Sequence, residues 1–416
     1  MPATADALAR ATDALAAAFD GGAPVELTAD GAALPRPEAR DPRRCGDPEA
    51  VAVVRTSGST GTPKQIVLTG AALRASAAAT ARWLGGEGAW LLALGVHYVA
   101  GLAVLSRSIA AGTAPVALPP GPFTPAAFAT GAAALPDDAG PRLVSLVPTQ
   151  LARLLAADAD PAGRAALRSF DRVLVGGARL DPALRAAAEA AGVRLTATYG
   201  MAETCGGCVY DGVPLPGVTA AVAPDGPDAP PRVRLAGPMV AAGYLDDPAR
   251  TAAHFVPAAD GARAFLTEDT GVLSPTDDGG VRLAVTGRLD DVVITGGVKV
   301  SAAAVTAVLE AHPGVAAAHV AGVPDPEWGA RLCAAVVPAH PAAAPDEAVL
   351  RAHVREALGA ATILTFAVSY LFLGRLRTGA TEDLSAAWEG RPGRRGRTET
   401  ADADAEDAYT EGRFRE

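Results

Sequence analysis

Between residues 51 and about 240, short apolar runs alternate with longer segments rich in Ala. The runs of Val, Leu and Trp predict strands, and the Ala-rich segments predict helices. Strands that alternate with helices are typical of a layered α/β domain with a largely parallel sheet. We expect strands at 51–54, 90–94, 143–147, 172–175 and 195–198, and helices at 71–84, 148–157 and 182–191.

The pattern changes after this region. Residues 232–288 contain short apolar stretches separated by turn residues ("RVRLAG", "RAFLTEDTGVL", "GGVRLAVTGR"), which predict a β-rich subdomain. A helix at 301–311 and a strand–loop–strand unit at 319–338 then predict a small α+β domain. We divide the chain into a large N-terminal domain at 1–289, a small C-terminal domain at 290–384 and a polar tail at 385–416, predicted to be disordered.

One uncharged stretch, 357–374, approaches the minimum length of a membrane span. Its Gly, Ser and Thr residues, and its position after a predicted helix, favour a buried strand or short helix, so no membrane span is expected. The net charge of −10 argues against a nucleic-acid partner. The start of the chain does not resemble a secretory signal, and its four cysteines suit a reducing compartment, which predicts a cytoplasmic protein.

Cys205 and Cys208 have C-x-x-C spacing, but no second pair exists to complete a metal site. We interpret them as incidental cysteines of a glycine-rich loop. The stronger chemical signal is "VRTSGSTGTPKQ" at 54–65. Its glycines permit tight turns, its hydroxyls and backbone N–H groups suit phosphate oxygens, and Lys64 supplies charge. It differs from the Walker loop because Lys64 follows a proline and precedes no Ser or Thr.

Five further motifs follow this loop in order: "VLVGGARL" (173–180), "TYGMAET" (198–204), "FLTEDTG" (265–271), "GRLDD" (287–291) and "ITGGVKVS" (294–301). Together they resemble the acyl-adenylate-forming superfamily, which includes acyl-CoA synthetases, luciferases and adenylation domains. Within it the chain is most similar to the o-succinylbenzoate–CoA ligases of menaquinone biosynthesis. The short stretch before the loop, "SLVPTQLARLL" (145–155) and "GGCVYDGVPLPG" (206–217) carry this narrower resemblance.

The resemblance implies a large α/β domain with a β-rich subdomain and a small mobile α+β domain, hinged near Asp290. It implies an acid–thiol ligase that uses ATP, Mg²⁺ and coenzyme A, with a small carboxylic acid as partner. The acid first forms an acyl-adenylate, and coenzyme A then displaces AMP. Two alternatives stay open: a CoA ligase for another aryl or fatty acid, and a degenerate relative that binds nucleotide without turnover. The oligomeric state is also open.

The resemblance also assigns residues. It implies catalytic roles for Lys64, Glu203 and Lys299, with Glu203 as the Mg²⁺ ligand. The implied nucleotide-binding residues are Thr56, Ser57, Gly58, Ser59, Thr60, Gly61, Gly176, Gly177, Ala178, Thr198, Tyr199, Gly200, Asp269 and Arg288. The implied acid-binding residues are His97, Tyr98, Gly101, Thr149 and Gln150, and the loop of the thioester step contains Gly296 and Gly297.

Four positions depart from the family pattern. Ala202 replaces a hydroxyl residue that meets the α-phosphate, Glu268 replaces a glycine, and Val298 replaces a glutamate. Ala380 stands where relatives carry the lysine that bridges the attacking carboxylate and the α-phosphate. Loss of one such transition-state contact costs about 2.7–4 kcal/mol by analogy with an oxyanion donor. We therefore expect impaired adenylation, with an added carboxylate from Glu268 near the nucleotide.

Overall fold

The computed structural model describes residues 5–56, 63–136, 140–156, 159–224, 231–258, 260–277, 279–289, 292–295, 298–325, 329–340, 343–358 and 367–370. By its internal contacts the chain separates into two compact units, Met1–Val292 and Val293–Glu416. The predicted hinge residue Asp290 and the predicted tail at 385–416 lie outside the described residues.

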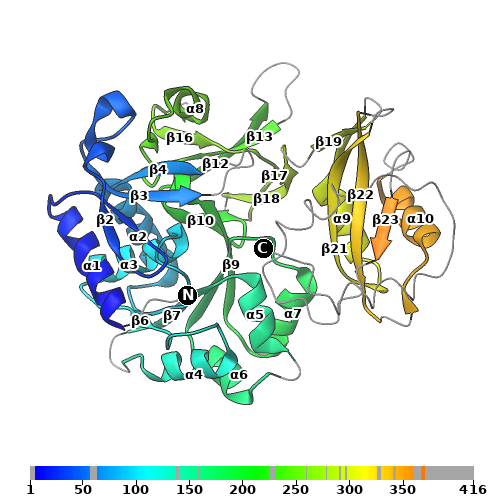
Figure 1. Ribbon diagram of the computed structural model, residues 1–416, viewed down its shortest axis with the longest axis horizontal. Helices are drawn as coiled ribbons and strands as arrows, with labels where there is room; N and C mark the ends of the chain where they lie inside the picture. The colour runs from blue at the N-terminus through cyan, green and yellow to red at the C-terminus, as the bar shows by residue number, and fades with distance from the viewer. Residues whose placement is uncertain are drawn as a thin grey trace, which may run out of the picture. The chain divides into compact units, whose positions relative to one another are not determined.

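A seven-stranded sheet lies at the centre of the large unit, with strand order β11-β10-β9-β8-β7-β5-β6 (Figure 1). Strands β5 to β9 are parallel, and β10 and β11 continue the sheet antiparallel at one edge. The strands predicted in this sheet are confirmed. Their bounds are β5 Ala89–Leu92, β6 Val116–Ala117, β7 Arg142–Leu146, β8 Arg172–Val175, β9 Leu195–Met201, β10 Gly206–Tyr210 and β11 Val213–Pro214.

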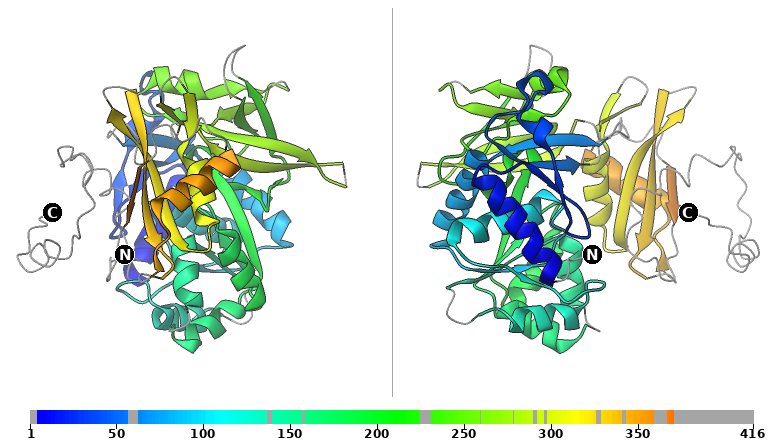
Figure 2. Two further views of the ribbon diagram at one scale, coloured as in Figure 1. Left: turned by 90° about the vertical axis from the view of Figure 1, so that its right-hand side faces the viewer. Right: turned by 60° about the vertical axis from the view of Figure 1, so that its left-hand side comes forward.

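The side chains of this sheet divide between two apolar clusters, as the two-residue period of a strand requires. Trp90 and Leu92 of β5 pack on one face with residues of α1, α2 and α3, while Leu91 packs on the other with residues of α4 to α7. Figure 2 shows α1 in dark blue on the outside of the first face. The helices are α1 Ala5–Phe19, α2 Gly70–Leu84, α3 Val99–Ala111, α4 Pro125–Ala133, α5 Pro148–Leu155, α6 Pro161–Arg168 and α7 Pro182–Ala190.

The helices predicted at 71–84, 148–157 and 182–191 are confirmed, with ends shifted by up to two residues. Local chemistry sets these ends. The Thr69 hydroxyl accepts the N–H of Ala72 at the start of α2, and Gly85 closes that helix at φ +80°. Helices α3, α4 and α6 were not predicted; α4 and α6 are only nine and eight residues long, and α3 is apolar along most of its length, which hides the period of a helix.

The strand predicted at 51–54 is confirmed, but it does not lie in the central sheet. It belongs to β3 (Ala50–Thr56), which pairs antiparallel with β4 (Lys64–Thr69) in a second, five-stranded sheet of order β14-β4-β3-β1-β2. The other strands are β1 Val25–Leu27, β2 Ala33–Pro35 and β14 Gly243–Tyr244. An apolar run predicts a buried strand but not its partners, which here are β4, antiparallel, and β1, parallel.

The β-rich subdomain is confirmed. Four strands form an antiparallel sheet of order β12-β13-β16-β15, and β17 pairs with β18 in a separate hairpin. The bounds are β12 Thr219–Pro224, β13 Pro231–Ala236, β15 Phe255–Pro257, β16 Arg263–Leu266, β17 Asp269–Pro275 and β18 Val281–Arg288. A short helix, α8 (Pro248–His254), connects β14 to β15.

The small unit has the predicted α+β content. Helix α9 (Ala302–Glu310) and the hairpin of β21 (Val315–Asp325) and β22 (Gly329–Pro338) confirm two predicted elements. Further elements are β19 Val292–Thr295, β20 Val298–Ser301, α10 Glu347–Leu358 and β23 Ala367–Tyr370. Strand β23 lies inside the uncharged stretch at 357–374 and pairs parallel with β22. Among the helices in the described ranges, none has the length and apolar character needed to cross a bilayer.

Candidate active site

Four groups of predicted site residues lie at one edge of the central sheet. His97 follows β5, Thr149 follows β7, Gly176 follows β8, and Thr198 lies near the end of β9. These strands are parallel neighbours, so their carboxyl ends meet at one edge. Ligands of open α/β sheets bind outside the carboxyl ends of the strands. The fold therefore gathers residues that are about 100 positions apart in the sequence.

The turn after β8 requires glycine. A Cβ at Gly176 would lie 2.3 Å from Oγ1 of Thr198, and Gly177 has φ +82°. The backbone of this turn therefore passes directly against β9, where Thr198, Tyr199 and Gly200 lie. Ala178 is the next residue, and its side chain is exposed. This close approach leaves no room for a side chain at Gly176.

Asp269 and Arg288 face each other across the β17–β18 hairpin, where they are direct register partners. Asp269 is only 5% exposed. Its Oδ2 accepts the hydroxyl of Tyr199 at 2.6 Å, and its Oδ1 lies 3.4 Å from Nη1 of Arg288. Burial, followed by the negative charge of Asp269, raises the pKa of Tyr199, which keeps its hydroxyl a donor. Three predicted nucleotide residues from distant segments thus form one polar cluster.

Glu203 lies in a 3₁₀ turn, Ala202–Thr204, and is 6% exposed. Its Oε1 accepts the hydroxyl of Tyr244 at 2.8 Å. Burial, followed by the charge of Glu203, raises the pKa of that tyrosine. No hydrogen bond to Oε2 comes from a residue within the described ranges, so this oxygen remains able to bind a cation. Ala202, beside it, is buried and brings only a methyl group.

The phosphate-loop segment begins and ends at two paired residues. Thr56 closes β3 and Lys64 opens β4, directly opposite each other. Nζ of Lys64 lies 5.8 Å from the ring centroid of Tyr244, the same tyrosine that binds Glu203. Two of the predicted catalytic residues therefore share one aromatic neighbour. Ser57, Gly58, Ser59, Thr60 and Gly61 lie outside the described residues.

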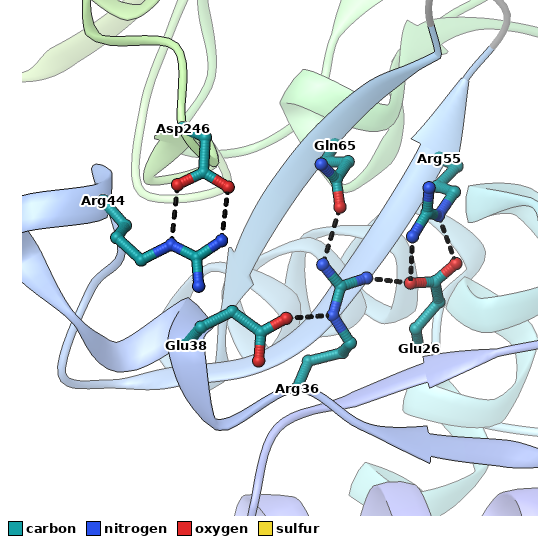
Figure 3. A network of polar contacts seen from close by, with 7 residues as sticks. All are labelled: Glu26, Arg36, Glu38, Arg44, Arg55, Gln65 and Asp246. Carbon is teal, nitrogen blue, oxygen red and sulfur yellow. Dashed lines mark hydrogen bonds and ion pairs between the residues drawn. The ribbon is translucent and has the colours of Figure 1, made fainter.

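A polar network holds both ends of this loop (Figure 3). The carboxylate of Glu26 accepts two hydrogen bonds from Arg55, the residue before Thr56, and one from Arg36. Arg36 also donates to Oε1 of Gln65, the residue after Lys64, at 2.6 Å, and to Glu38. The short N-terminal segment thus connects to the second-last residue of β3, Arg55, and to the second residue of β4, Gln65.

The predicted acid-binding segment precedes and begins α3. His97 is partly buried, and its Nδ1 has no hydrogen-bond partner in the described part of the chain. Burial lowers its pKa, so the ring stays neutral at pH 7. The ring lies 3.9 Å from that of Tyr98, centroid to centroid, and Tyr98 is 59% exposed. Gly101 lies one turn into the helix and is buried.

Gln150 has a structural role that the sequence did not indicate. Its Oε1 accepts the N–H of Val147, and its Nε2 donates to the carbonyl of Ala93 at 2.8 Å. The amide therefore caps α5 and connects the ends of β5 and β7. Thr149 is exposed, and its side chain makes no hydrogen bond to another residue in the described ranges. Binding of the acid by either residue stays a prediction.

Glu268 does not stand as a free charge beside the nucleotide residues. Arg232 donates to its carboxylate at 2.9 Å, and Nε2 of His254 lies 3.6 Å from the same oxygen. The glutamate that replaces the glycine of the family is therefore paired with a positive charge from Arg232. In the small unit, β20 contains the backbone of Lys299. Its side chain, with Gly296, Gly297 and Ala380, lies outside the described residues.

Tyr244 is the site residue that sequence reasoning missed. It joins Glu203 to Lys64, yet it lies in β14, far along the chain from both. Its only sequence signal is a lone aromatic residue in "AAGYLDD". Cys205 and Cys208 are buried free thiols, and no cluster of three or more metal-binding side chains occurs within the described ranges. Neither finding indicates a metal at the C-x-x-C motif.

A large α/β domain with this polar edge, followed by a small α+β domain, is the architecture of AMP-binding enzymes. The sequence profile of the AMP-binding enzyme family matches residues 4–245, and that of the AMP-binding enzyme C-terminal domain matches 304–373. The first match alone spans more than half of the chain. The chain therefore belongs to the AMP-binding enzymes, and it is an acid–thiol ligase by class, as the motifs predicted.

The relatives are more specific. A probable 2-succinylbenzoate–CoA ligase of Mycobacterium tuberculosis is 42% identical over 317 residues, which cover 75% of this chain and 77% of the relative. The 2-succinylbenzoate–CoA ligase of Geobacillus kaustophilus is 32% identical over 370 residues, covering 84% of this chain and 71% of that one. The predicted resemblance to these ligases is confirmed.

Solved structures agree. The o-succinylbenzoate CoA synthetase of Bacillus subtilis, in complex with its acyl-adenylate intermediate, aligns with a TM-score of 0.63 and 26% identity, covering 84% of this chain and 70% of that one. The amide bond synthetase McbA of Marinactinospora thermotolerans aligns with a TM-score of 0.65 and 28% identity, covering 82% and 70%. The fold class predicted from the sequence is confirmed.

Proposed function

We propose that this protein is an ATP-dependent ligase that converts o-succinylbenzoate to o-succinylbenzoyl-CoA in menaquinone biosynthesis. The observation that carries the proposal is the 42% identity to a probable 2-succinylbenzoate–CoA ligase over 75% of the chain. The geometry supports it, because Lys64 and Glu203 share the neighbour Tyr244, and Asp269 contacts Tyr199 and Arg288. The free thiols support a reducing compartment, and we propose the cytoplasm.

In the first half-reaction, a carboxylate oxygen of the acid bonds to the α-phosphorus of ATP. The bond from that phosphorus to the bridging oxygen breaks, and pyrophosphate leaves with the electron pair. Asp269 and Arg288 hold the ribose, so that the α-phosphorus is positioned for attack. Lys64 neutralises charge on the leaving phosphates. The buried methyl of Ala202 supplies no hydrogen bond to the α-phosphate, which favours a slow step.

Glu203 would bind Mg²⁺ through Oε2, because Tyr244 already occupies Oε1. Mg²⁺ is bound in such sites by one or two carboxylates together with substrate phosphates, so a single oxygen suits it. The metal would neutralise phosphate charge. The Tyr244 hydroxyl fixes the orientation of the carboxylate.

In the second half-reaction, the sulfur of coenzyme A bonds to the acyl carbon and AMP leaves with the bonding electron pair. The thiol proton passes to solvent. We propose that Gly296, Gly297 and Lys299 form the loop for this step, and that the small domain turns about Asp290 to present it. The boundary near residue 290 and the roles of His97, Tyr98, Gly101, Thr149 and Gln150 toward the acid are part of the same proposal.

The two half-reactions are measured separately. The purified full chain receives o-succinylbenzoate, ATP and Mg²⁺, and pyrophosphate release is recorded. In parallel it receives synthetic o-succinylbenzoyl-adenylate and coenzyme A, and thioester is recorded. Formation of both pyrophosphate and thioester supports the proposal. Thioester without pyrophosphate indicates that Ala202 and Ala380 have abolished adenylation. Neither product, with ATP still bound, indicates a nucleotide-binding protein without turnover, and clear preference for an aryl or fatty acid contradicts the substrate.

A further inference from the structure

Arg107 of α3 is a buried cation that has no carboxylate partner among the described residues. Only 8% of the residue is exposed. Its guanidinium stays charged, because arginine keeps its proton in proteins. A buried charge is costly unless a counter-charge and hydrogen bonds compensate for it. Arg107 is therefore a candidate for a bound counter-ion.

The contacts that Arg107 makes leave most of its donors available. Its Cζ lies 5.0 Å from the ring centroid of Trp90, and its Nη2 donates a long hydrogen bond of 3.5 Å to the hydroxyl of Tyr210. Its Nε is buried and has no hydrogen-bond partner within the described ranges. A guanidinium has five N–H groups, and in this part of the chain only one of them meets an acceptor.

A small cavity lies beside this guanidinium. Thr80 of α2, Trp90 of β5 and Leu143 of β7 line it together with Arg107. The centre of a water molecule can occupy about 10 Å³ of the cavity, which is about the space that one water-sized occupant needs. A phosphate ion is much larger, so the cavity excludes it. A chloride ion is only slightly larger than a water molecule.

The polar groups of the cavity offer donors rather than acceptors. Oγ1 of Thr80 lies 3.2 Å from the hydroxyl oxygen of Tyr210. Since that oxygen already accepts from Arg107, Tyr210 directs its own proton to Thr80, and Thr80 keeps its hydroxyl proton for the cavity. Glu87 also lines the cavity, but it is exposed, so solvent and salt screen its charge. A positive charge with unused donors favours an anion.

We propose that this cavity binds one chloride ion through the guanidinium of Arg107 and the hydroxyl of Thr80. The ion supplies the counter-charge of the buried cation and connects α2 to α3. The site is separate from the candidate active site, because none of the described residues assigned to ATP, the acid or coenzyme A lines the cavity. A ligand that binds only the folded state raises its stability as the ligand concentration rises. Chloride therefore stabilises the fold.

The direct test is a structure of the full chain crystallised with sodium bromide as the only halide, with anomalous diffraction recorded at the bromine edge. The expected result is an anomalous peak within hydrogen-bond distance of the Arg107 guanidinium. A cavity without an anomalous peak, whether empty or filled by water, would overturn the proposal. This test uses the unaltered protein and does not depend on the folding of a variant.

A solution test shows whether the ion binds outside a crystal. The Tm of the full chain is measured at increasing sodium chloride, with ionic strength held constant by sodium gluconate, whose anion is too large for the cavity. The Tm should rise with chloride and then level off. Bromide should replace chloride, and phosphate should not. A Tm that does not respond to chloride would mean binding at crystal concentration only, and would also overturn the proposal.

Two variants assign the response to this cavity. Arg107→Met keeps an apolar side chain of similar length without the charge, so its Tm should no longer respond to chloride. Thr80→Val should raise the chloride concentration of the half-maximal response about tenfold, because one hydrogen bond to a charged group is lost. Arg168→Met is the matched control, because Arg168 is exposed on α6, and it should keep the full response. A wild-type response in both Arg107→Met and Thr80→Val would contradict the site.

Discussion

The carboxylate of Glu26 is the centre of the network that holds the phosphate-loop hairpin, and replacing it tests that network. Glu26→Ala removes the acceptor of one hydrogen bond from Arg36 and two from Arg55 (Figure 3). The side chain of Glu26 is 12% exposed and that of Arg36 is 11% exposed. The variant therefore leaves a nearly buried guanidinium with fewer partners, which is the costly way to break an ion pair.

The magnitude follows from the exposure of each partner. Breaking a fully buried pair costs about 3–5 kcal/mol. Arg36 keeps Glu38 and Gln65, so its share is that of one hydrogen bond to a charged group, about 1.5–3 kcal/mol. Arg55 is 51% exposed, so its share is that of a surface pair, about 0.2–1 kcal/mol. We expect a loss of about 2–4 kcal/mol in the free energy of unfolding, or about 4–8 °C in Tm.

The assay is urea unfolding of the full chain, followed by circular dichroism, with Tm measured by calorimetry. Glu189→Ala is the matched control, because Glu189 pairs with Arg185 at 3.0 Å but its side chain is 58% exposed. The control should lose less than about 0.5 kcal/mol. A Tm of Glu26→Ala equal to that of the control would refute the reasoning, since it would show that the network contributes no more than a surface pair.

Three further results are expected. Asp269→Ala should raise the KM for ATP about tenfold or more, and also the KM for supplied adenylate, because both molecules carry the ribose that the carboxylate is proposed to bind; an unchanged KM for ATP would contradict that role. A maleimide at pH 8 should label Cys45 in the native protein but not Cys205 or Cys208, because both are fully buried, and burial raises the pKa of Cys208 to about 12; rapid native labelling of either would contradict their burial. Stability should fall above about pH 9–10, because burial raises the pKa of Cys208 from its usual 9.0 and of Tyr199 from its usual 10.0. The native state then holds protons that the unfolded state releases; a Tyr199→Phe variant should show a smaller fall in the urea midpoint between pH 9 and 10.5, and equal falls would contradict the assignment.

Much of the fold could be predicted because its signals are local. The strands at 172–175 and 195–198 and the helix at 71–84 follow from apolar runs and Ala-rich segments. The end of α2 follows from Gly85, whose left-handed backbone most side chains avoid. The partner of β3 could not be predicted in this way, because an apolar strand has the same composition in a parallel sheet and in an antiparallel hairpin.

The candidate site also has features that could be predicted from neighbouring residues and features that depend on distant ones. The phosphate loop and the "TYGMAET" segment could be recognised in the sequence. Each is a short continuous stretch, so the glycines and hydroxyl residues that mark it lie next to each other in the chain. The role of Gln150 could not be recognised, because its second partner, the carbonyl of Ala93, lies 57 residues away. The counter-charge of Glu268 likewise comes from Arg232 of β13, which is 36 residues away.

The sequence by itself therefore determined which short segments are strands, helices and tight turns, and which of them contain residues suited to phosphate, ribose and a metal ion. Only the tertiary structure decided which of these residues meet. Tyr244 and Glu203 are 41 positions apart, and Tyr199 and Asp269 are 70 apart, yet each pair shares a hydrogen bond. The physical reason is that turn and helix preferences act between near neighbours, whereas pairing and burial of distant groups depend on how the whole chain packs.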